Sequence, residues 1–60
     1  MVNDLKVTLW VIEERKGEGW VQRRVCARQA LAVRFIERLR YQSADPHRYR
    51  LRPESKRLLQ

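Results

Sequence analysis

Two side chains in this sequence have the reactivity of a nucleophile and a general base, namely Cys26 and His47. A thiol becomes a catalytic nucleophile when a histidine lies within hydrogen-bond reach and a third group orients that histidine. These residues lie at the ends of different predicted elements, and no orienting group is evident. One cysteine and one histidine also fall short of the four ligands of a zinc site. We therefore expect no enzyme activity, metal, cofactor or small-molecule substrate, and we expect Cys26 to be a small buried residue.

A second kind of chemistry, recognition of anions, is offered by tryptophans and arginines in the predicted strands. The candidate partner-binding residues are Trp10, Trp20, Arg24, Arg48, Arg50 and Arg52. Tryptophan stacks on unpaired bases, and arginine binds a phosphate or a carboxylate through two parallel hydrogen bonds. Two alternatives stay open. The indoles could pack on each other and on the arginine stems, or the arginines could protect an edge strand from aggregation.

The net charge of the 60-residue chain is +7, and it is concentrated in the second part of the sequence. Residues 20–60 hold eleven of the fourteen Lys and Arg residues and three of the seven Asp and Glu residues. Such a field attracts nucleic acid, an anionic membrane or an acidic protein groove; a genome rich in arginine codons is the alternative cause. The apolar stripe of the predicted helix is needed for the core, so we expect no membrane partner. A single cysteine forms no internal disulfide, which indicates a reducing, cytoplasmic location.

Residues 4–14 are mostly β-branched or aromatic, and they predict the central strand of a small sheet. Alternation along this strand gives one set of Leu5, Val7, Leu9 and Val11 and a second set of Lys6, Thr8, Trp10 and Ile12. Both sets contain apolar residues, so both faces of the strand need cover. That requirement favours a central position in the sheet.

A hairpin turn is predicted around Gly17, because glycine tolerates the positive φ of tight turns. The returning strand follows at residues 20–25. The preferred register, with Gly17 at the apex, pairs Leu9 with Val25 and Trp10 with Arg24. This register places apolar residues opposite each other, and a slip of one residue would exchange the two faces.

Residues 27–42 change to helical periodicity. The expected core-facing side chains are Leu31, Ala32, Phe35, Ile36 and Leu39. Arg34 and Arg38 are expected to be ordinary solvated charges. Residues 47–52 alternate again and predict a third strand, with Arg48, Arg50 and Arg52 on one face. Pro53 is expected to end that strand.

The element order predicts an α+β fold of the ββαβ type, with a single domain at residues 1–53 and a basic C-terminal tail at residues 54–60. We expect a three-stranded antiparallel sheet in the order 2-1-3, with one helix packed on one face. The expected helix-facing residues of the sheet are Leu5, Val7, Leu9, Val11, Val25, Tyr49 and Leu51. The other face would then expose Ile12 together with the six candidate binding residues.

The sequence pattern resembles the short phage-encoded inhibitors of bacterial RNA polymerase found in short-tailed coliphages. The segments that carry the resemblance are LKVTLWVIE at residues 5–13, Ala30-Leu31 with Phe35, and RYRLRPE at residues 48–54. Members of that family have this length and element order, and an Arg-x-Arg-Pro motif in their last strand grips an acidic part of the polymerase. Arg50, Arg52 and Pro53 match that motif, although the helix is basic here and acidic in the family. Small phage proteins that block CRISPR complexes are similar in size and order.

These observations predict a small basic binding protein without catalysis. It would be a stoichiometric inhibitor or regulator that docks on an acidic surface of a nucleic-acid enzyme or ribonucleoprotein complex, with Arg50 and Arg52 as primary anchors. The alternatives are a DNA- or RNA-binding module with an exposed Trp and Arg face, and a homodimer that buries its tryptophans. The core of so short a chain barely offsets its chain entropy, so a partner or a second copy would also stabilise the fold.

Overall fold

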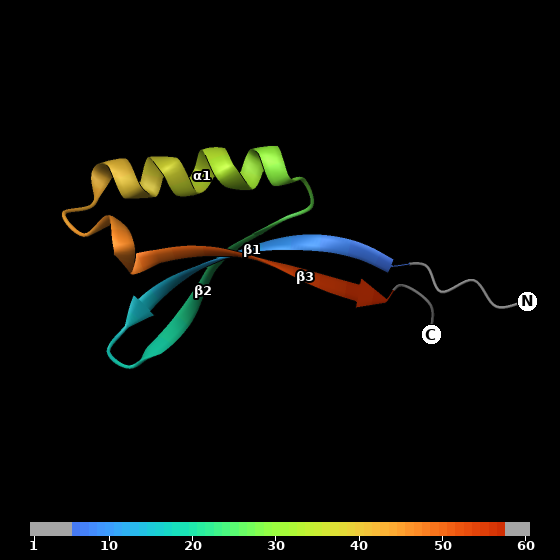
Figure 1. The fold of residues 1–60 in the computed structure, drawn as a ribbon, viewed down its shortest axis with the longest axis horizontal. Helices are drawn as coiled ribbons and strands as arrows, with labels where there is room; N and C mark the ends of the chain where they lie inside the picture. Colours follow the sequence, from blue (N-terminus) through green and yellow to red (C-terminus); the bar gives the residue numbers. More distant parts are fainter. Residues whose placement is uncertain (1–5, 58–60) are drawn as a thin grey trace, which may run out of the picture.

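Three strands and one α-helix make up the described part of this protein, residues 6–57 of the computed structural model (Figure 1). The elements are β1 (Lys6–Lys16), β2 (Gly19–Cys26), α1 (Gln29–Gln42), the short 3-10 helix η1 (Pro46–Arg48) and β3 (Tyr49–Arg57). The strands form one antiparallel sheet in the order β2-β1-β3. The helix α1 lies over one face of this sheet. The predicted ββαβ fold, with the opening strand in the middle, is confirmed.

The β1–β2 hairpin turns at Gly17 and Glu18, and Gly17 has a positive φ of 62°. Glycine adopts this conformation without a steric cost, because it has no Cβ. The preferred register is wrong, because Trp10 lies opposite Cys26 rather than Arg24. The turn sets the pairing next to it, and an irregularity farther along β2 changes the pairing again.

That irregularity is a β-bulge, which shifts the register of the ladder between Ile12 and Glu13 of β1. Ile12 pairs with Arg24 and Glu13 pairs with Gln22, so Arg23 has no partner across the ladder. An extra residue in one strand reverses the alternation of side chains beyond it. Trp20 and Arg24, which simple alternation places together, therefore project from opposite faces.

The hydrophobic core joins the sheet to α1 through Ile12, Cys26, Ala32 and Ile36. Partly buried side chains pack around it, namely Trp10, Phe35, Leu39, Tyr49 and Leu51. The expectation that Tyr49 and Leu51 face the helix is therefore confirmed.

The expected face of β1 is wrong, because Trp10 and Ile12 lie under α1 in place of Val7, Leu9 and Val11. Periodicity could not choose between the two faces, since both alternating sets contain apolar residues. Trp10 and Ile12 pack against the helix, whereas Val11 on the opposite side of β1 is also buried, at 2% exposed, so β1 has cover on both faces at this point. Val25 is likewise on the uncovered side and 40% exposed, and Leu5 lies outside the described residues.

The helix α1 begins at Gln29, two residues after its predicted start, and its N-cap residue Arg28 makes no side-chain capping bond. Ala32 and Ile36 are buried and form the centre of its packed face. Leu31, which was predicted to face the core, is 53% exposed because it lies to one side of that centre.

The strand β3 continues through Pro53 to Arg57, whereas the sequence predicted that the strand would end at Pro53. Proline has no N–H to donate, but an edge strand accepts it where the N–H would point away from the neighbouring strand. β3 is an edge strand of the described sheet. Residues 54–57 of the predicted tail therefore belong to the sheet, and residues 58–60 lie outside the described part.

The β1–β3 ladder extends well beyond α1 and β2, toward the two ends of the chain (Figure 1). β2 pairs with β1 only from Trp10 onward, whereas β3 pairs with β1 from Lys6 onward. The radius of gyration is 13.9 Å, against about 10 Å for a compact chain of this length. The core is therefore small and lies toward one end of an elongated molecule.

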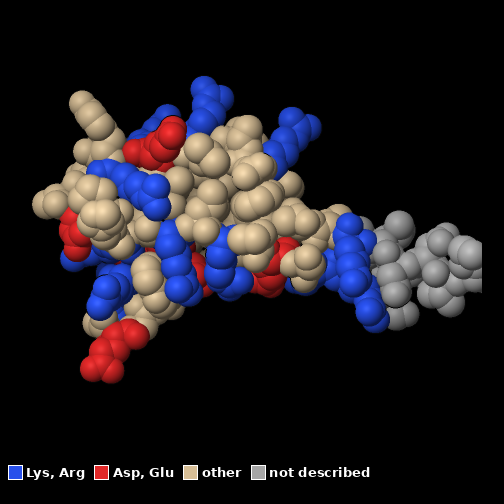
Figure 2. All heavy atoms as spheres, in the orientation of Figure 1, with Lys and Arg blue, Asp and Glu red and all other residues tan. Residues whose placement is uncertain are grey.

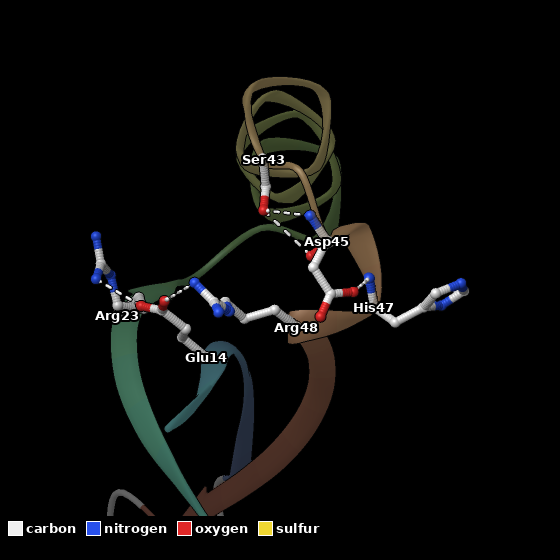
Figure 3. Close-up of polar contacts among 6 residues, drawn as sticks. All are labelled: Glu14, Arg23, Ser43, Asp45, His47 and Arg48. Atoms are coloured by element: carbon white, nitrogen blue, oxygen red, sulfur yellow. Dashed lines mark hydrogen bonds and ion pairs between the residues drawn. The ribbon is translucent and has the colours of Figure 1, made fainter. Parts of the chain in front are cut away.

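The turn η1 connects α1 to β3 and is organised by Asp45 (Figure 3). Ser43 Oγ accepts a hydrogen bond from the Asp45 N–H at 3.0 Å, and Asp45 Oδ1 accepts one from the His47 N–H at 3.2 Å. His47 and Arg48 belong to this turn, so the third strand begins two residues later than predicted. Arg48 is therefore not part of an alternating arginine row.

Candidate binding surfaces

Glu13 is the centre of a charged cluster on the open face of the sheet, which is the face that α1 does not cover. Its Oε1 accepts a hydrogen bond from Arg50 Nε at 2.7 Å and lies 3.2 Å from Arg52 Nε. The Glu13 side chain is 10% exposed, whereas those of the two arginines are 44% and 42% exposed. Together with Trp20, these three residues are called the Glu13 cluster below.

The two arginines lower the pKa of Glu13 below its ordinary value of 4.5. The hydrogen bond from Arg50 has the largest effect and the one from Arg52 follows, whereas burial acts in the opposite direction and is outweighed. The hydrogen bond to Glu13 in turn raises the pKa of Arg52. Glu13 is therefore ionised at neutral pH, and it neutralises part of the charge of both guanidinium groups.

Trp20 is covered on one side by an arginine of the same cluster. Arg50 Cζ lies 4.0 Å from the centroid of the Trp20 ring, which is a close cation–π contact. Trp20 is still 37% exposed. The guanidinium occupies a ring face on which a nucleic-acid base would otherwise stack.

Glu14, the next residue of β1, holds a second pair of arginines on the helix side of the sheet (Figure 3). Arg23 Nη1 donates to Glu14 Oε1 at 2.7 Å, and Arg48 Nη1 lies 3.7 Å from Glu14 Oε2. Arg23 is the extra residue of the bulge, and bulges redirect side chains in this way. Consecutive strand residues point to opposite faces, so Glu13 and Glu14 hold one pair of arginines on each side of β1.

These contacts give three of the predicted binding residues, Arg48 and the primary anchors Arg50 and Arg52, a structural role. A carboxylate that is buried without a partner costs considerable free energy. The arginines remove that cost for Glu13 and Glu14, which are 8% and 5% exposed as whole residues. Their charge is therefore only partly available to a binding partner.

A groove of about 650 Å³ lies between β2 and α1. Its lining consists of Arg24, Val25, Cys26 and Ala27 from the β2 side and Leu31, Arg34, Phe35 and Arg38 from α1. The helical residues follow the spacing i, i+3, i+4 and i+7, so they form one stripe along α1. Val25 and Leu31 are exposed, which leaves apolar surface of the groove open to solvent. This feature is called the β2–α1 groove below.

Arg24, Arg34 and Arg38 line the β2–α1 groove, and no carboxylate does. Arg24 Cζ lies 4.8 Å from the centroid of the Phe35 ring. Within residues 6–57, none of these arginines forms an ion pair. Basic side chains stand out from both the helix layer and the sheet layer in Figure 2. What sets the groove apart is that it gathers three arginines without a described ion pair around one hollow.

The six predicted binding residues do not share one surface. Trp20, Arg50 and Arg52 meet in the Glu13 cluster, Arg48 joins Glu14, Arg24 lines the β2–α1 groove, and Trp10 packs against the core. The prediction of a single Trp and Arg face is therefore wrong. The bulge in β2 and the turn η1 redirect the side chains that simple alternation would have aligned.

Two groups of residues in these surfaces were not predicted from the sequence. Glu13 and Glu14 could have been found, because two adjacent carboxylates in an apolar strand need cationic partners on both faces. Arg34 and Arg38 carry no such signal. The groove that they line exists only where the edge of β2 meets one side of α1.

The structure does not bring Cys26 and His47 together. Cys26 is a buried free thiol in the core, which confirms its predicted burial. His47 is exposed in η1 and lines a separate small pocket beside Gly17. Across residues 6–57, no group of three or more His, Cys, Asp or Glu side chains is placed to hold a metal ion. No helix in the same range is long and apolar enough to cross a membrane.

Comparisons of this chain with family models, with curated proteins and with solved structures found no match. The resemblance to the phage inhibitors of RNA polymerase stays a prediction, based on the sequence pattern alone. Function must therefore be argued from the charge and shape of the surfaces described above.

Proposed function

We propose that this chain is a small binding protein that docks on an acidic surface of a partner protein through the β2–α1 groove. The observation that carries the proposal is the charge of that groove, because three arginines line it without a carboxylate. Arginine binds carboxylates through paired, charge-assisted hydrogen bonds. Electrostatic attraction between complementary patches also speeds the encounter and selects among partners.

We further propose that docking makes the protein a stoichiometric inhibitor or regulator of a nucleic-acid enzyme or ribonucleoprotein complex. Support for this role comes from the Arg-x-Arg-Pro segment at Arg50, Arg52 and Pro53 and from the net charge of +7. In this proposal the Glu13 cluster is a secondary contact. The exposed part of each of its guanidinium groups can still reach a partner at the rim of an interface.

Direct binding to DNA or RNA is the second candidate, and the net charge of +7 favours it. The surroundings of two aromatic rings favour a protein partner over nucleic acid. Trp20 and Phe35 each have a guanidinium over the ring. That guanidinium occupies surface on which an unpaired base would stack.

The test is retention of partners from a bacterial lysate by the immobilised protein, with and without nuclease treatment. We expect the wild-type chain to retain the same protein in both cases, because the contact does not run through nucleic acid. The variant Arg34→Glu with Arg38→Glu should lose this partner. The control variant Lys6→Glu with Lys16→Glu has the same net charge but leaves the groove intact, and it should keep the partner.

Loss of all partners after nuclease treatment would favour the nucleic-acid alternative. In that case the purified protein should bind single-stranded RNA or DNA, with an affinity that falls log-linearly with salt. Equal retention by the groove variant and the wild type would contradict the assignment of the groove.

A further inference from the structure

We infer that the β2–α1 groove binds an extended acidic segment of the partner protein, which joins the free edge of β2 as a fourth strand. This inference rests on the proposed function and specifies its mode of contact. It combines three features of the described residues: an unpaired strand edge, a groove beside that edge, and positive charge in the groove.

The free edge of β2 is the first feature. Within the described sheet, β2 pairs only with β1, so the backbone groups on its other side have no strand partner. Such an edge is a template for strand addition, in which backbone hydrogen bonds supply the affinity. The other edge strand, β3, contains Pro53, and proline makes an edge less suited to pairing. β2 contains no proline.

The place of contact along β2 follows from the bulge and from the groove. Arg23 is unpaired in the bulge, which disturbs the edge at that point. Beyond the bulge, Arg24, Val25, Cys26 and Ala27 line the groove. We therefore place the added strand along residues 24–27, where α1 forms the second wall.

The chemistry of the added strand follows from the two sides of β2. Arg24 lies on the helix side with Arg34 and Arg38, whereas Val25 lies on the open side and is 40% exposed. Side chains of an added strand alternate between the same two sides. Its sequence should therefore alternate between acidic residues that meet the arginines and β-branched apolar residues that lie beside Val25. A phosphodiester backbone cannot supply the matching N–H and C=O groups, so the observations favour a peptide over nucleic acid.

The probe that tests this inference is a capped eight-residue peptide of alternating glutamate and valine, titrated into the isotopically labelled full-length protein and followed by NMR. We expect amide shifts at residues 24–27 and along the groove side of α1, together with slower amide exchange in β2. Arg34→Glu with Arg38→Glu should weaken binding by about tenfold or more, whereas Lys6→Glu with Lys16→Glu should retain the wild-type affinity.

Backbone methylation separates strand addition from simple charge attraction. Two further peptides carry N-methyl groups, one on all the valines and one on all the glutamates. Only alternate N–H groups of an added strand point at its neighbour, so one of these peptides should lose about tenfold or more in affinity. Unchanged affinity for both would overturn the inference, and so would equal competition by a single-stranded oligonucleotide of the same length.

The outcomes also separate this inference from the proposed function. If the glutamate–valine peptide does not bind but the lysate partner still depends on Arg34 and Arg38, acidic docking stands and strand addition is overturned. If neither binding depends on these arginines, both proposals fail. If both bindings depend on them and one methylated peptide is rejected, both proposals are supported.

Discussion

The arginines of the open sheet face and the arginines of the β2–α1 groove differ in what lies beside them. Arg50 and Arg52 share the buried carboxylate of Glu13, and Arg50 also covers Trp20. Arg34 and Arg38 lie one helical turn apart on α1, and no described carboxylate pairs with either. The first set therefore contributes to the fold, whereas the second set is free to bind a partner.

This difference shows why a count of basic residues does not locate a binding site. The alternation of side chains along β3 correctly predicted that Arg50 and Arg52 lie on one face. Their contacts with Glu13 and Trp20 leave less of each guanidinium group available to bind a partner. Arginines that line a groove without a counter-charge remain able to bind an anionic partner, although no local sequence pattern identifies them as binding residues. Replacing each set of arginines separately tests whether the two sets differ in this way.

The largest effect is expected when Arg50 and Arg52 are both replaced by glutamate. The change would place two new carboxylates beside the buried Glu13, so we expect the free energy of unfolding to fall further than it does when one partner of the cluster is neutralised. Urea denaturation followed by circular dichroism measures this loss. The matched control, Arg34→Glu with Arg38→Glu, changes the net charge equally and should alter stability by less than about 0.5 kcal/mol.

Equal destabilisation by the two double variants would show that the sets do not differ. The expected instability also affects the choice of binding experiments. Loss of a partner by the Arg50 and Arg52 double variant would report unfolding as readily as a lost contact, so the groove variants are the informative ones.

Glu13→Gln should have the next largest effect. It removes the charge that two guanidinium groups share, and we expect a loss of about 1–2 kcal/mol in the free energy of unfolding at neutral pH. Glu14→Gln is the parallel change on the helix side and should act in the same direction. An unchanged melting temperature for Glu13→Gln would show that Arg50 and Arg52 need no counter-charge.

The same carboxylate predicts a pH dependence. The pKa of Glu13 is lower in the folded protein than its ordinary value of 4.5, so its contribution to stability is complete above that ordinary value. The contribution is lost as the pH falls through the lower, folded-state pKa. Thermal melts between neutral and acidic pH should therefore show a stability loss in the wild type that is smaller in Glu13→Gln.

Arg50→Lys should have a smaller effect, because it keeps the charge but loses the planar group over Trp20. We expect a cost of about 0.5–1 kcal/mol and a shift of tryptophan emission to longer wavelength as the ring becomes more exposed. Arg52→Lys is the control, since only Arg50 is described over the Trp20 ring. An identical emission spectrum for both variants would contradict the cation–π contact.

The smallest effect is expected for Arg34→Gln with Arg38→Gln, and its sign is opposite. Like charges four residues apart on a helix repel, so their removal should raise the free energy of unfolding by about 0.2–0.5 kcal/mol. Denaturation at low salt gives the clearest measurement, because salt screens the repulsion. A loss of stability would show that these arginines have partners that the described contacts do not include.

Local sequence patterns were enough to predict the order of the elements, the antiparallel sheet with β1 in the middle, the glycine turn and the burial of Cys26. Hydrophobic periodicity and turn chemistry are local properties, so the sequence contains them directly. It also correctly indicated that Arg50 and Arg52 share a face, since they are two residues apart in one regular strand.

Long-range packing selected the face of β1 that lies under the helix, the position of the bulge in β2, and the continuation of β3 through Pro53. β1 is apolar in both of its alternating sets, so the choice of face depends on how Trp10 and Ile12 pack against α1. The groove likewise depends on contacts between elements that are distant in the sequence. Its arginines became recognisable as a site only after the fold had placed β2 and α1 side by side.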